Sequence, residues 1–362
     1  MVADTALTTP LTRTLGIDVP IIQAPIGRVG GPELAAAVSN AGGLGMLGVS
    51  FADPTHLRAV IRATRALTKR PFGVNLLLHW DQRERLKICL DEGVRIVSYG
   101  WNASPDDEYI TDPHDAGSLV MHTIGTAEEG RRTADAGVDV IVAQGLDAGG
   151  HVWGRIGTLS LIPAVVDAVG ATPVVAAGGI GDGRGLAAVL ALGAQAGWMG
   201  TRFVVAEEAL SHPDYRARIV AATETDAVWS SGVFDLGFAA PVRTLENTTL
   251  RAWKEAGSPP TGERPGEGEP VAERRDGTPV IRYDFAPPVE GMTGDTEAMA
   301  NYAGQSVGVV RRVQPAGEIV REVAGQARRI FAASAAHGGD TEGASDPAFV
   351  PSTRAGRQAC VR

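Results

Sequence analysis

One of the seven histidines in the sequence directly follows a pair of glycines. The segment QGLDAGGHVWG (144–154) comes after an apolar run, GVDVIVA (137–143), so Gly149, Gly150 and His151 lie just past an expected buried strand. An imidazole can donate, accept or transfer a proton near neutral pH. Glycines remove side chains where a ligand or another stretch of backbone comes close. The segment predicts either a histidine beside a ligand or a tight backbone contact.

Two further glycine-rich segments could bind an anion through backbone amides. The segment AAGGIGDGRG (176–185) passes from an expected strand into an expected helix through Gly178 and Gly179, and the next strand ends at Gly200 and Thr201. Backbone amides at a helix N-terminus bind phosphate groups. We expect a phosphate site here; the alternative is that these glycines only make tight turns.

Two polar residues interrupt apolar strands. Asn75 lies inside FGVNLLL (72–78), and a buried amide needs hydrogen-bond partners, either protein groups or the edge of a heteroaromatic ring; both remain open. His122 ends LVMHTI (119–124) and could belong to the site or support it. Near His151 only Asp147 has a metal-like spacing, so we expect no metal. Without a nucleophile elbow or a strand-end lysine, a bound cofactor is the economical source of chemistry.

Composition places the chain among ordinary globular proteins. Its 362 residues are 44% apolar and 21% charged, with a formal net charge of −9. That charge argues against nucleic acid or an anionic membrane as the main partner, although it still allows a local basic pocket for one phosphate. Two distant cysteines, Cys89 and Cys360, exclude a disulfide framework. The N-terminus lacks an apolar signal region, so we expect a cytoplasmic protein.

Short apolar runs alternate with helical patterns along the first two hundred residues. Such continuous apolar runs are typical of buried parallel strands, and eight of them with crossover helices predict a (β/α)8 TIM barrel of class α/β. The expected strands are residues 20–24, 43–48, 72–78, 95–100, 119–124, 138–143, 173–178 and 196–201, and the expected helices are 32–42, 54–67, 81–93, 126–137, 159–170 and 183–194. The polar and glycine-rich segments described above fall at the carboxyl ends of these strands, where barrels carry their active sites.

One glycine pattern favours packing over binding. Gly43, Gly45 and Gly48 match G-x-G-x-x-G, but they follow a helix and form a strand, and residues 62–71 contain no acid. A dinucleotide fingerprint needs the opposite order and an acid about 20 residues later. We expect these glycines to let a helix pack close to the barrel.

The regular pattern ends after the eighth strand. We expect a barrel core with the cofactor site at 1–204, a helical extension with a mobile loop packed on the barrel at 205–335, and a disordered tail at 336–362. Within the extension, 203–255 and 299–334 have helical spacing, and 258–279 has the Gly, Pro and charge content of a mobile loop. Between strands four and five, residues 101–117 are polar and predict a partly irregular lid.

The sequence also resembles a known family. QAPIG at strand one, NLLL at strand three, QGLDAGGH at strand six, AAGGIGDGRG at strand seven and MGTRF at strand eight are similar to the nitronate monooxygenases, formerly 2-nitropropane dioxygenases, and so is NYAGQSVG near the C-terminal end. The resemblance runs in order from about residue 15 to 335. It implies an FMN-dependent barrel enzyme that oxidises alkyl nitronates with O₂ to a carbonyl compound and nitrite.

The resemblance assigns site residues by motif position. His151 would be the acid/base or substrate-orienting residue over the flavin, and Gly178, Gly179, Gly200 and Thr201 would hold the phosphate. The other cofactor-binding residues would be Ala24, Pro25, Ile26, Asn75, His122, Gln144, Gly149 and Gly150. Three positions depart from the family pattern: Ile26 replaces a common Met, Thr123 replaces a Lys, and Trp153 follows His151 closely enough to reshape the substrate pocket.

Other functions remain open at this level. The same motifs occur in FMN-dependent NAD(P)H enoyl-thioester (enoyl-CoA or enoyl-ACP) reductases and NAD(P)H:quinone reductases, so O₂ or NAD(P)H could be the co-substrate beside a small-molecule substrate. A non-enzymatic barrel that binds a phosphorylated ligand is the remaining alternative. The sequence does not decide whether the chain is a homodimer.

Overall fold

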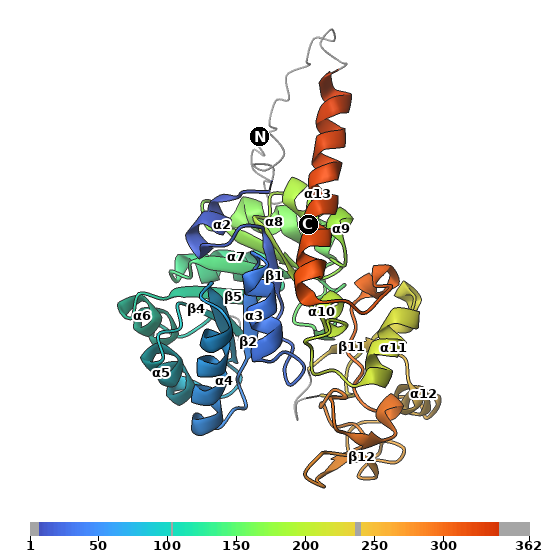
Figure 1. Ribbon diagram of the computed structural model, residues 1–362. Coiled ribbons are helices and arrows are strands. Elements are labelled where there is room, and N and C mark those ends of the chain that lie inside the picture. The colour runs from blue at the N-terminus through green and yellow to red at the C-terminus, as the bar shows by residue number, and fades with distance from the viewer. Residues whose placement is uncertain (1–6, 103, 236–239, 340–362) are drawn as a thin grey trace, which may run out of the picture.

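The computed structural model describes residues 7–102, 104–235 and 240–339 (Figure 1). Eight parallel strands pair in the order β1-β9-β8-β6-β5-β4-β3-β2. They are β1 (Ile21–Gln23), β2 (Gly45–Gly48), β3 (Phe72–Leu77), β4 (Ile96–Gly100), β5 (Leu119–Ile124), β6 (Val140–Gln144), β8 (Val174–Ala177) and β9 (Ala196–Met199). A parallel bridge between Ile22 and Leu44 joins β1 to β2. The bridge brings the two ends of the sheet together, which confirms the predicted (β/α)8 barrel.

Helices follow the strands as the apolar spacing predicts. They are α3 (Pro32–Asn40), α4 (Pro54–Leu67), α5 (Arg83–Asp91), α6 (Glu108–Asp115), α7 (Ala127–Asp135), α8 (Thr158–Val169) and α9 (Gly183–Ala191). Side chains of Asp53, Thr126 and Asp182 cap α4, α7 and α9 by accepting backbone N–H bonds. The segment 101–117, predicted to be partly irregular, contains α6 in its second half, and His114 lies in that helix.

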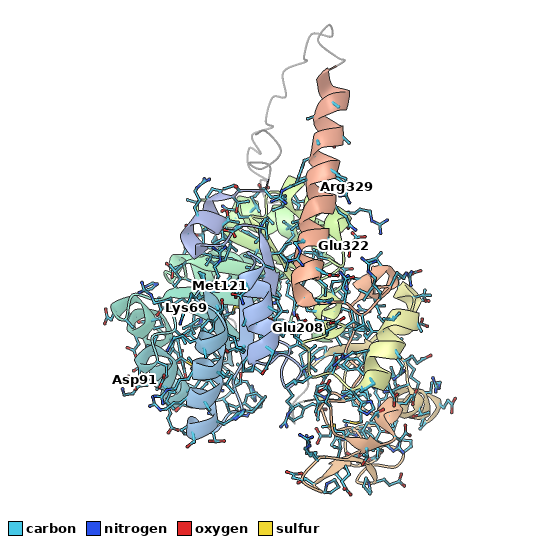
Figure 2. All side chains as sticks on the ribbon, viewed as in Figure 1. Lys69, Asp91, Met121, Glu208, Glu322 and Arg329 are labelled. Atoms are coloured by element: carbon cyan, nitrogen blue, oxygen red, sulfur yellow. The ribbon has the colours of Figure 1, made fainter. Side chains whose placement is uncertain are left out.

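Alternate residues of each strand face the barrel interior and the helices. Ile22, Met46, Ile96 and Met121 pack in one buried cluster inside the barrel together with Leu11 and Leu15 of α2 (Pro10–Leu15), which closes its N-terminal end; Met121 is labelled in Figure 2. Their strand neighbours Ile21, Leu47, Val97 and Val120 join a second cluster that includes helix residues such as Leu34 and Leu57. This alternation decides which strand residues can reach the barrel mouth.

Two of the three glycines of the G-x-G-x-x-G pattern, Gly43 and Gly45, have a packing role, and at Gly45 the close neighbour is a helix, as predicted. A Cβ atom added at Gly45 would lie 2.0 Å from the Ala35 carbonyl oxygen, and one at Gly43 would lie 2.8 Å from that of Ile21. A side chain at Gly45 would therefore push α3 away from β2. Cys89 is likewise a buried residue of α5, as predicted, whereas Cys360 lies outside the described residues.

The segment after β9 is less helical than predicted. It contains α10 (Thr201–Val204), α11 (Pro213–Ala221), β10 (Ala227–Ser230), β11 (Val242–Leu245), α12 (Thr248–Glu255), β12 (Pro270–Glu273), β13 (Pro279–Ile281), β14 (Thr293–Gly294) and α13 (Ala316–Gly339). Two corrections follow: 203–255 includes two strands, and the expected loop 258–279 includes β12. In 299–334 the α-helix begins only at Ala316, after a 3₁₀ turn over Gln305–Val309. Short strands that pair with distant segments leave no helical or alternating period long enough to recognise.

Helix α13 completes the outer layer of the barrel. Val323 and Ala327 are buried in the cluster between strands and helices, and a Cβ atom at Gly183 would lie 2.3 Å from the Gln326 Cβ. Figure 1 shows α13 beside α9, and Figure 2 labels Glu322 and Arg329 along it. The predicted boundary at 204 remains a proposal, but this packing favours counting α13 with the barrel and treating 205–315 as an insertion. The expected tail at 336–362 begins as helix through 339, and its remainder lies outside the described residues.

Two further observations concern the described ranges alone. None of their helices combines the length and apolar content that a membrane span requires. They also contain no cluster of three or more His, Cys, Asp or Glu side chains that could hold a metal ion.

Candidate active site

A cavity of about 280 Å³ opens at the carboxyl end of the barrel strands. Each strand contributes an inward-facing residue at or near its carboxyl end to the lining: Ala24, Gly48, Asn75, Gly100, Thr123, Gln144, Ala177 and Gly200. Five of these eight are glycine or alanine. The barrel is filled below by larger side chains such as Met46 and Met121, so the loss of side-chain volume at this level creates the cavity.

The structure brings all but one of the predicted site residues to this cavity. Its lining includes Ala24, Pro25, Ile26, Asn75, Gln144, Gly149, Gly150, His151, Trp153, Gly178, Gly179, Gly200 and Thr201. Residues from the ends of five barrel strands meet here, although up to 177 positions separate them in the chain. Convergence of this kind at the carboxyl face is the usual location of a barrel active site.

His122 is the exception, and its predicted place at the cofactor is corrected. It is fully buried and does not line the cavity; its ring Nε2 lies 2.8 Å from the Asn102 carbonyl oxygen. Met121 faces the barrel interior, so Thr123 shares that face while His122 points out toward the helices. His122 therefore packs on the side of β5 that faces the helices, away from the cavity.

The paired glycines have different roles. A Cβ atom at Gly149 would lie 2.2 Å from the Gly304 nitrogen and 2.4 Å from the Ala303 carbonyl carbon, so this residue accommodates a backbone contact. Gly150 has a φ of +77°, and a Cβ atom there would meet nothing within 4 Å. Gly149 therefore meets another backbone segment, as one of the two explanations predicts, whereas Gly150 leaves open space that a ligand could enter.

Long-range contacts fix the segment that carries His151. Gly150 and His151 form the short strand β7 (Gly150–His151), which pairs antiparallel with β11 of the insertion. The buried Arg243 of β11 donates hydrogen bonds to the Leu146 and Ala227 carbonyls at 2.9 and 2.8 Å. The Gln144 side chain donates to the His151 carbonyl at 3.2 Å and accepts from the Trp153 backbone at 2.8 Å. Gln144 therefore holds this segment in place through two hydrogen bonds and also lines the cavity.

His151 is neutral at physiological pH. Burial lowers its pKa to about 4, and a hydrogen bond to the Phe234 backbone offsets only part of this effect. That bond favours the protonated ring, as a bond donated by a ring N–H does. Nε2 is buried without a hydrogen-bond partner among the described residues, so the donated bond comes from Nδ1. Nε2 then carries the lone pair and can accept a proton or a hydrogen bond from a ligand.

An aromatic wall surrounds this imidazole. The ring centroids of Trp101 and Tyr302 lie 5.6 and 5.5 Å from that of His151, and Trp153 packs edge-on against Trp101 at 5.4 Å. The Trp153 indole N–H donates to Glu129, 3.0 Å away, which holds the ring in place. Trp101 has a φ of +66°, a strained conformation for a side chain of this size. Sequence analysis missed Trp101 as a wall residue; its place directly after a strand end was the available signal.

The opposite side of the cavity consists of backbone turns. Gly178 and Gly179 have positive φ angles of 104° and 73°, which turn the chain sharply between β8 and α9. The Thr201 hydroxyl accepts a hydrogen bond from the Gly304 N–H at 2.9 Å and keeps its own proton to donate. The Asn75 amide donates only long bonds of 3.3 Å to Ser98, and no described residue donates to its carbonyl oxygen. These groups are open to a planar ligand with a phosphate tail.

A cation lies at the outer rim. Arg28 lines the cavity with a φ of +63°, and burial together with the nearby positive charge of Arg274 lowers its pKa. Asp284 attracts both arginines and lies 3.4 Å from the Arg274 guanidinium. The next residue, Phe285, lines the cavity and packs against the exposed Phe51 with ring centroids 5.8 Å apart. Sequence analysis did not identify this rim, because 283–287 reaches it from the insertion.

Comparison with known proteins identifies the family. The family model for nitronate monooxygenase matches residues 8–84 and 79–325. A nitronate monooxygenase of Pseudomonas aeruginosa is 33% identical over 89% of this chain and 100% of its own length. A (3aS,4S,5R,7aS)-5-hydroxy-7a-methyl-1-oxo-octahydro-1H-indene-4-carboxyl-CoA dehydrogenase of Mycobacterium tuberculosis is 42% identical over 205 residues, 56% of this chain. The chain spans only 57% of that relative.

Two solved structures have similar folds. FabK from Thermotoga maritima superimposes with a TM-score of 0.76 and 32% identity, over 91% of this chain and 99% of its own. A nitroalkane oxidase from Streptomyces ansochromogenes has a TM-score of 0.72 and 30% identity, over 89% and 99%. The family match and the site geometry agree, and the chain belongs to the nitronate monooxygenase family of flavin-dependent oxidoreductases.

Proposed function

We propose that the chain binds FMN at the cavity and oxidises alkyl nitronates, with O₂, to a carbonyl compound and nitrite. The observation that carries this proposal is the neutral His151, whose unpartnered Nε2 is enclosed by Trp101, Trp153 and Tyr302. An aromatic enclosure with one hydrogen-bonding atom suits a small, mostly apolar substrate. The activity of the Pseudomonas aeruginosa relative supports the same reaction.

The residues of the cavity fit a flavin mononucleotide. Open space at Gly150 and the small Ala24 and Gly200 leave room for a flat ring, and the Asn75 amide can bond to its edge. Gly178, Gly179 and Thr201 would hold the phosphate through amides and a hydroxyl. FMN would supply the electron transfer that no side chain here can perform.

The protein would then orient the substrate and handle its proton. The sequence allows either a protonated His151 that attracts an anionic nitronate or a neutral one that accepts a proton. The lowered pKa of His151 favours the neutral form. When a neutral nitroalkane enters, the proton on its α-carbon would pass to Nε2, leaving the nitronate anion beside the imidazolium. The aromatic wall would exclude water from both.

An anaerobic titration tests this proposal. The purified holoenzyme is mixed with an alkyl nitronate in one cuvette and with NADPH or NADH in another, and the visible flavin absorbance is followed. Bleaching by the nitronate alone is the expected result. Rapid bleaching by a nicotinamide, with the nitronate inert, would overturn it.

The rim favours one alternative reaction. Arg28 beside Arg274, with exposed Phe51 against Phe285, offers cations and an aromatic face to a nucleotide. NAD(P)H and coenzyme A thioesters both carry such a group, and one similar relative is a carboxyl-CoA dehydrogenase. An NAD(P)H-dependent enoyl-thioester or quinone reductase is therefore the second candidate, and the nicotinamide cuvette tests it.

A further inference from the structure

A second cavity, of about 510 Å³, lies at the opposite end of the barrel. It is bounded by the residues that precede three neighbouring strands, β3, β4 and β5, and by Thr14 and Leu15 of α2. The reaction proposed above needs no residue of this cavity. In barrels this face usually contributes stability and not catalysis, so a built binding site here would be an additional property of the chain.

Four cations and no carboxylate appear among the described lining residues of this cavity. They are Arg65 near the end of α4, Lys69 and Arg70 between α4 and β3, and Arg95 directly before β4. Figure 2 labels Lys69. The chain as a whole has a formal net charge of −9, so this local cluster of positive charge is opposite in sign to the net charge of the protein.

Two of the four cations have protein partners and two do not. Arg70 pairs with Asp18, and the Arg65 guanidinium donates to the Glu92 carbonyl, which is the C-cap of α5. These contacts anchor Arg65 and Arg70 and give each of them a structural reason to be present. In the described parts of the chain no carboxylate lies within ion-pair distance of Lys69 or Arg95, and neither is a hydrogen-bond donor in its side chain. Both residues are exposed, so their charged groups are available to a ligand.

Glycine opens the cavity beside Arg95. The chain turns through Gly93 and Gly117, with φ angles of 70° and 71°, as the C-terminal loops of α5 and α6. A Cβ atom at Gly117 would lie 3.5 Å from an Arg95 guanidinium nitrogen. The guanidinium thus lies beside the neighbouring loop, and both Arg95 and Gly117 line the cavity.

We propose that this cavity, the basal pocket, binds a small molecule carrying two or more phosphate charges. Guanidinium groups match phosphate oxygens with paired N–H donors, and the Lys69 ammonium adds a mobile point charge. Anchored Arg65 and Arg70 lose little conformational freedom when a ligand arrives. Apolar lining residues, among them Phe72 and Val94, could cover an organic part of the ligand.

The shape and charge of the chain favour a small ligand over a macromolecule. The positive groups converge in a concave site, whereas nucleic-acid binding needs a basic stripe along an exposed surface. The negative charge of the remaining chain would repel a long polyanion that extends beyond the pocket.

Calorimetric titration of the flavin-loaded full chain tests the proposal, since bound flavin blocks the upper phosphate site. Inorganic pyrophosphate and ADP are the probes, and we expect saturable binding near one equivalent that weakens as salt is added. Lys69→Ala/Arg95→Ala should weaken binding at least tenfold. The matched control, Lys87→Ala/Arg131→Ala, removes the same charge at exposed residues outside the pocket and should bind as the parent chain does.

A charge-preserving variant separates binding from folding. Lys69→Arg/Arg95→Lys should keep binding within about threefold, and unchanged circular dichroism should accompany both pocket variants. Tighter binding of ADP than of pyrophosphate would indicate a phosphorylated organic ligand, and equal binding would indicate inorganic phosphate chemistry. No saturable binding of either probe, undiminished binding to the alanine variant, or binding only of a long polyanion such as RNA would overturn the proposal.

Discussion

The two ends of the barrel are built from the same strands but differ in chemistry. The upper cavity is lined mainly by glycines, aromatic rings and neutral polar groups, with Arg28 and Asp147 as its charged residues, and its histidine is uncharged. The basal pocket is lined by four cations and by Leu15 of the helix that plugs the barrel. The upper residues lie at strand ends that face inward, whereas the lower cations come from the last turn of α4 and from the loops that precede β3 and β4.

If the basal pocket binds anions as proposed, one scaffold separates redox chemistry from ion binding. Strand ends are held rigidly by backbone hydrogen bonds to the neighbouring strands, which suits a site that must align a flat ring and a substrate. Long basic side chains on loops can adapt to a soluble anion but position nothing precisely enough for catalysis. We therefore expect substitutions at the upper end to change activity and those at the lower end to change only ligand affinity.

The largest expected effect comes from Gly149→Ala. Its new methyl group would collide with the backbone of Ala303 and Gly304, so the loop carrying His151 must shift, at a cost of about 3 kcal/mol. Urea unfolding and flavin content report the change. Gly150→Ala is the control: its site is open, and its positive φ costs only about 1 kcal/mol. Equal losses in the two variants would contradict the different roles given to the two glycines.

Next in size is the loss of turnover in His151→Asn. With a neutral nitroalkane as substrate, removing the proton acceptor at the cavity should lower kcat by about 100-fold or more while flavin remains bound. His122→Asn provides a matched comparison, because burial lowers the pKa of His122 to about 4 as well, yet that ring faces away from the cavity. Its kcat should stay within about threefold of the parent. Similar kinetics in the two variants would remove His151 from the mechanism.

Stability should depend on pH through the same two histidines. Both have a folded pKa of about 4 against an ordinary value of 6.5, so their contribution is complete above pH 6.5. As pH falls from 6.5 to 4, the unfolded chain takes up protons first and stability is lost, on the order of 3 kcal/mol for the fully buried His122. Carboxylates with a lowered pKa, such as Glu92 at about 2, change the pH dependence of stability only below pH 4.5.

Denaturant titrations between pH 7 and 5 measure this slope. We expect His122→Asn to flatten it. An unchanged slope in that variant would mean that His122 is not buried in its neutral form. It would also argue against its place on the side of β5 that faces the helices.

A smaller effect is expected at the rim. Arg28→Ala should raise KM for NADPH about tenfold if the nucleotide phosphate contacts this residue, since one charged hydrogen bond contributes about 1.5 kcal/mol or more. Steady-state kinetics at two salt concentrations would measure it. A KM for NADPH that is unaffected by the substitution would argue against the reductase alternative.

The smallest expected effect is an almost unchanged rate when the basal pocket is altered. Lys69→Ala/Arg95→Ala should leave kcat/KM for the nitronate within about twofold, because neither residue lines the upper cavity. Stopped-flow or steady-state assays suffice. A large loss of activity in a folded variant would show that the two ends of the barrel are coupled, and would break the separation described above.

Much of the barrel follows from local sequence. Continuous apolar runs predicted the eight strands, and helical spacing predicted the helices between them, two of which the structure shows to be capped by Asp53 and Asp182. These features depend on neighbours within a few residues, so the sequence expresses them directly. The same reasoning located His151, Gly150 and Thr201 at strand ends, which all barrels place on one face.

Other features were decided only by the tertiary structure. Whether His122 or Thr123 faces the cavity depends on strand orientation within the closed barrel, and a shift of one residue reverses it. Strands β7 and β11 form only because Arg243 and its neighbours return from the insertion to pair with Gly150 and His151. The lowered pKa of His151 likewise arises from walls supplied by distant segments. The sequence alone determined the barrel and the level of its active site, because both arise from short-range periodicity. Folding decided which side chains meet and which are charged, because those properties depend on contacts between residues far apart in the chain.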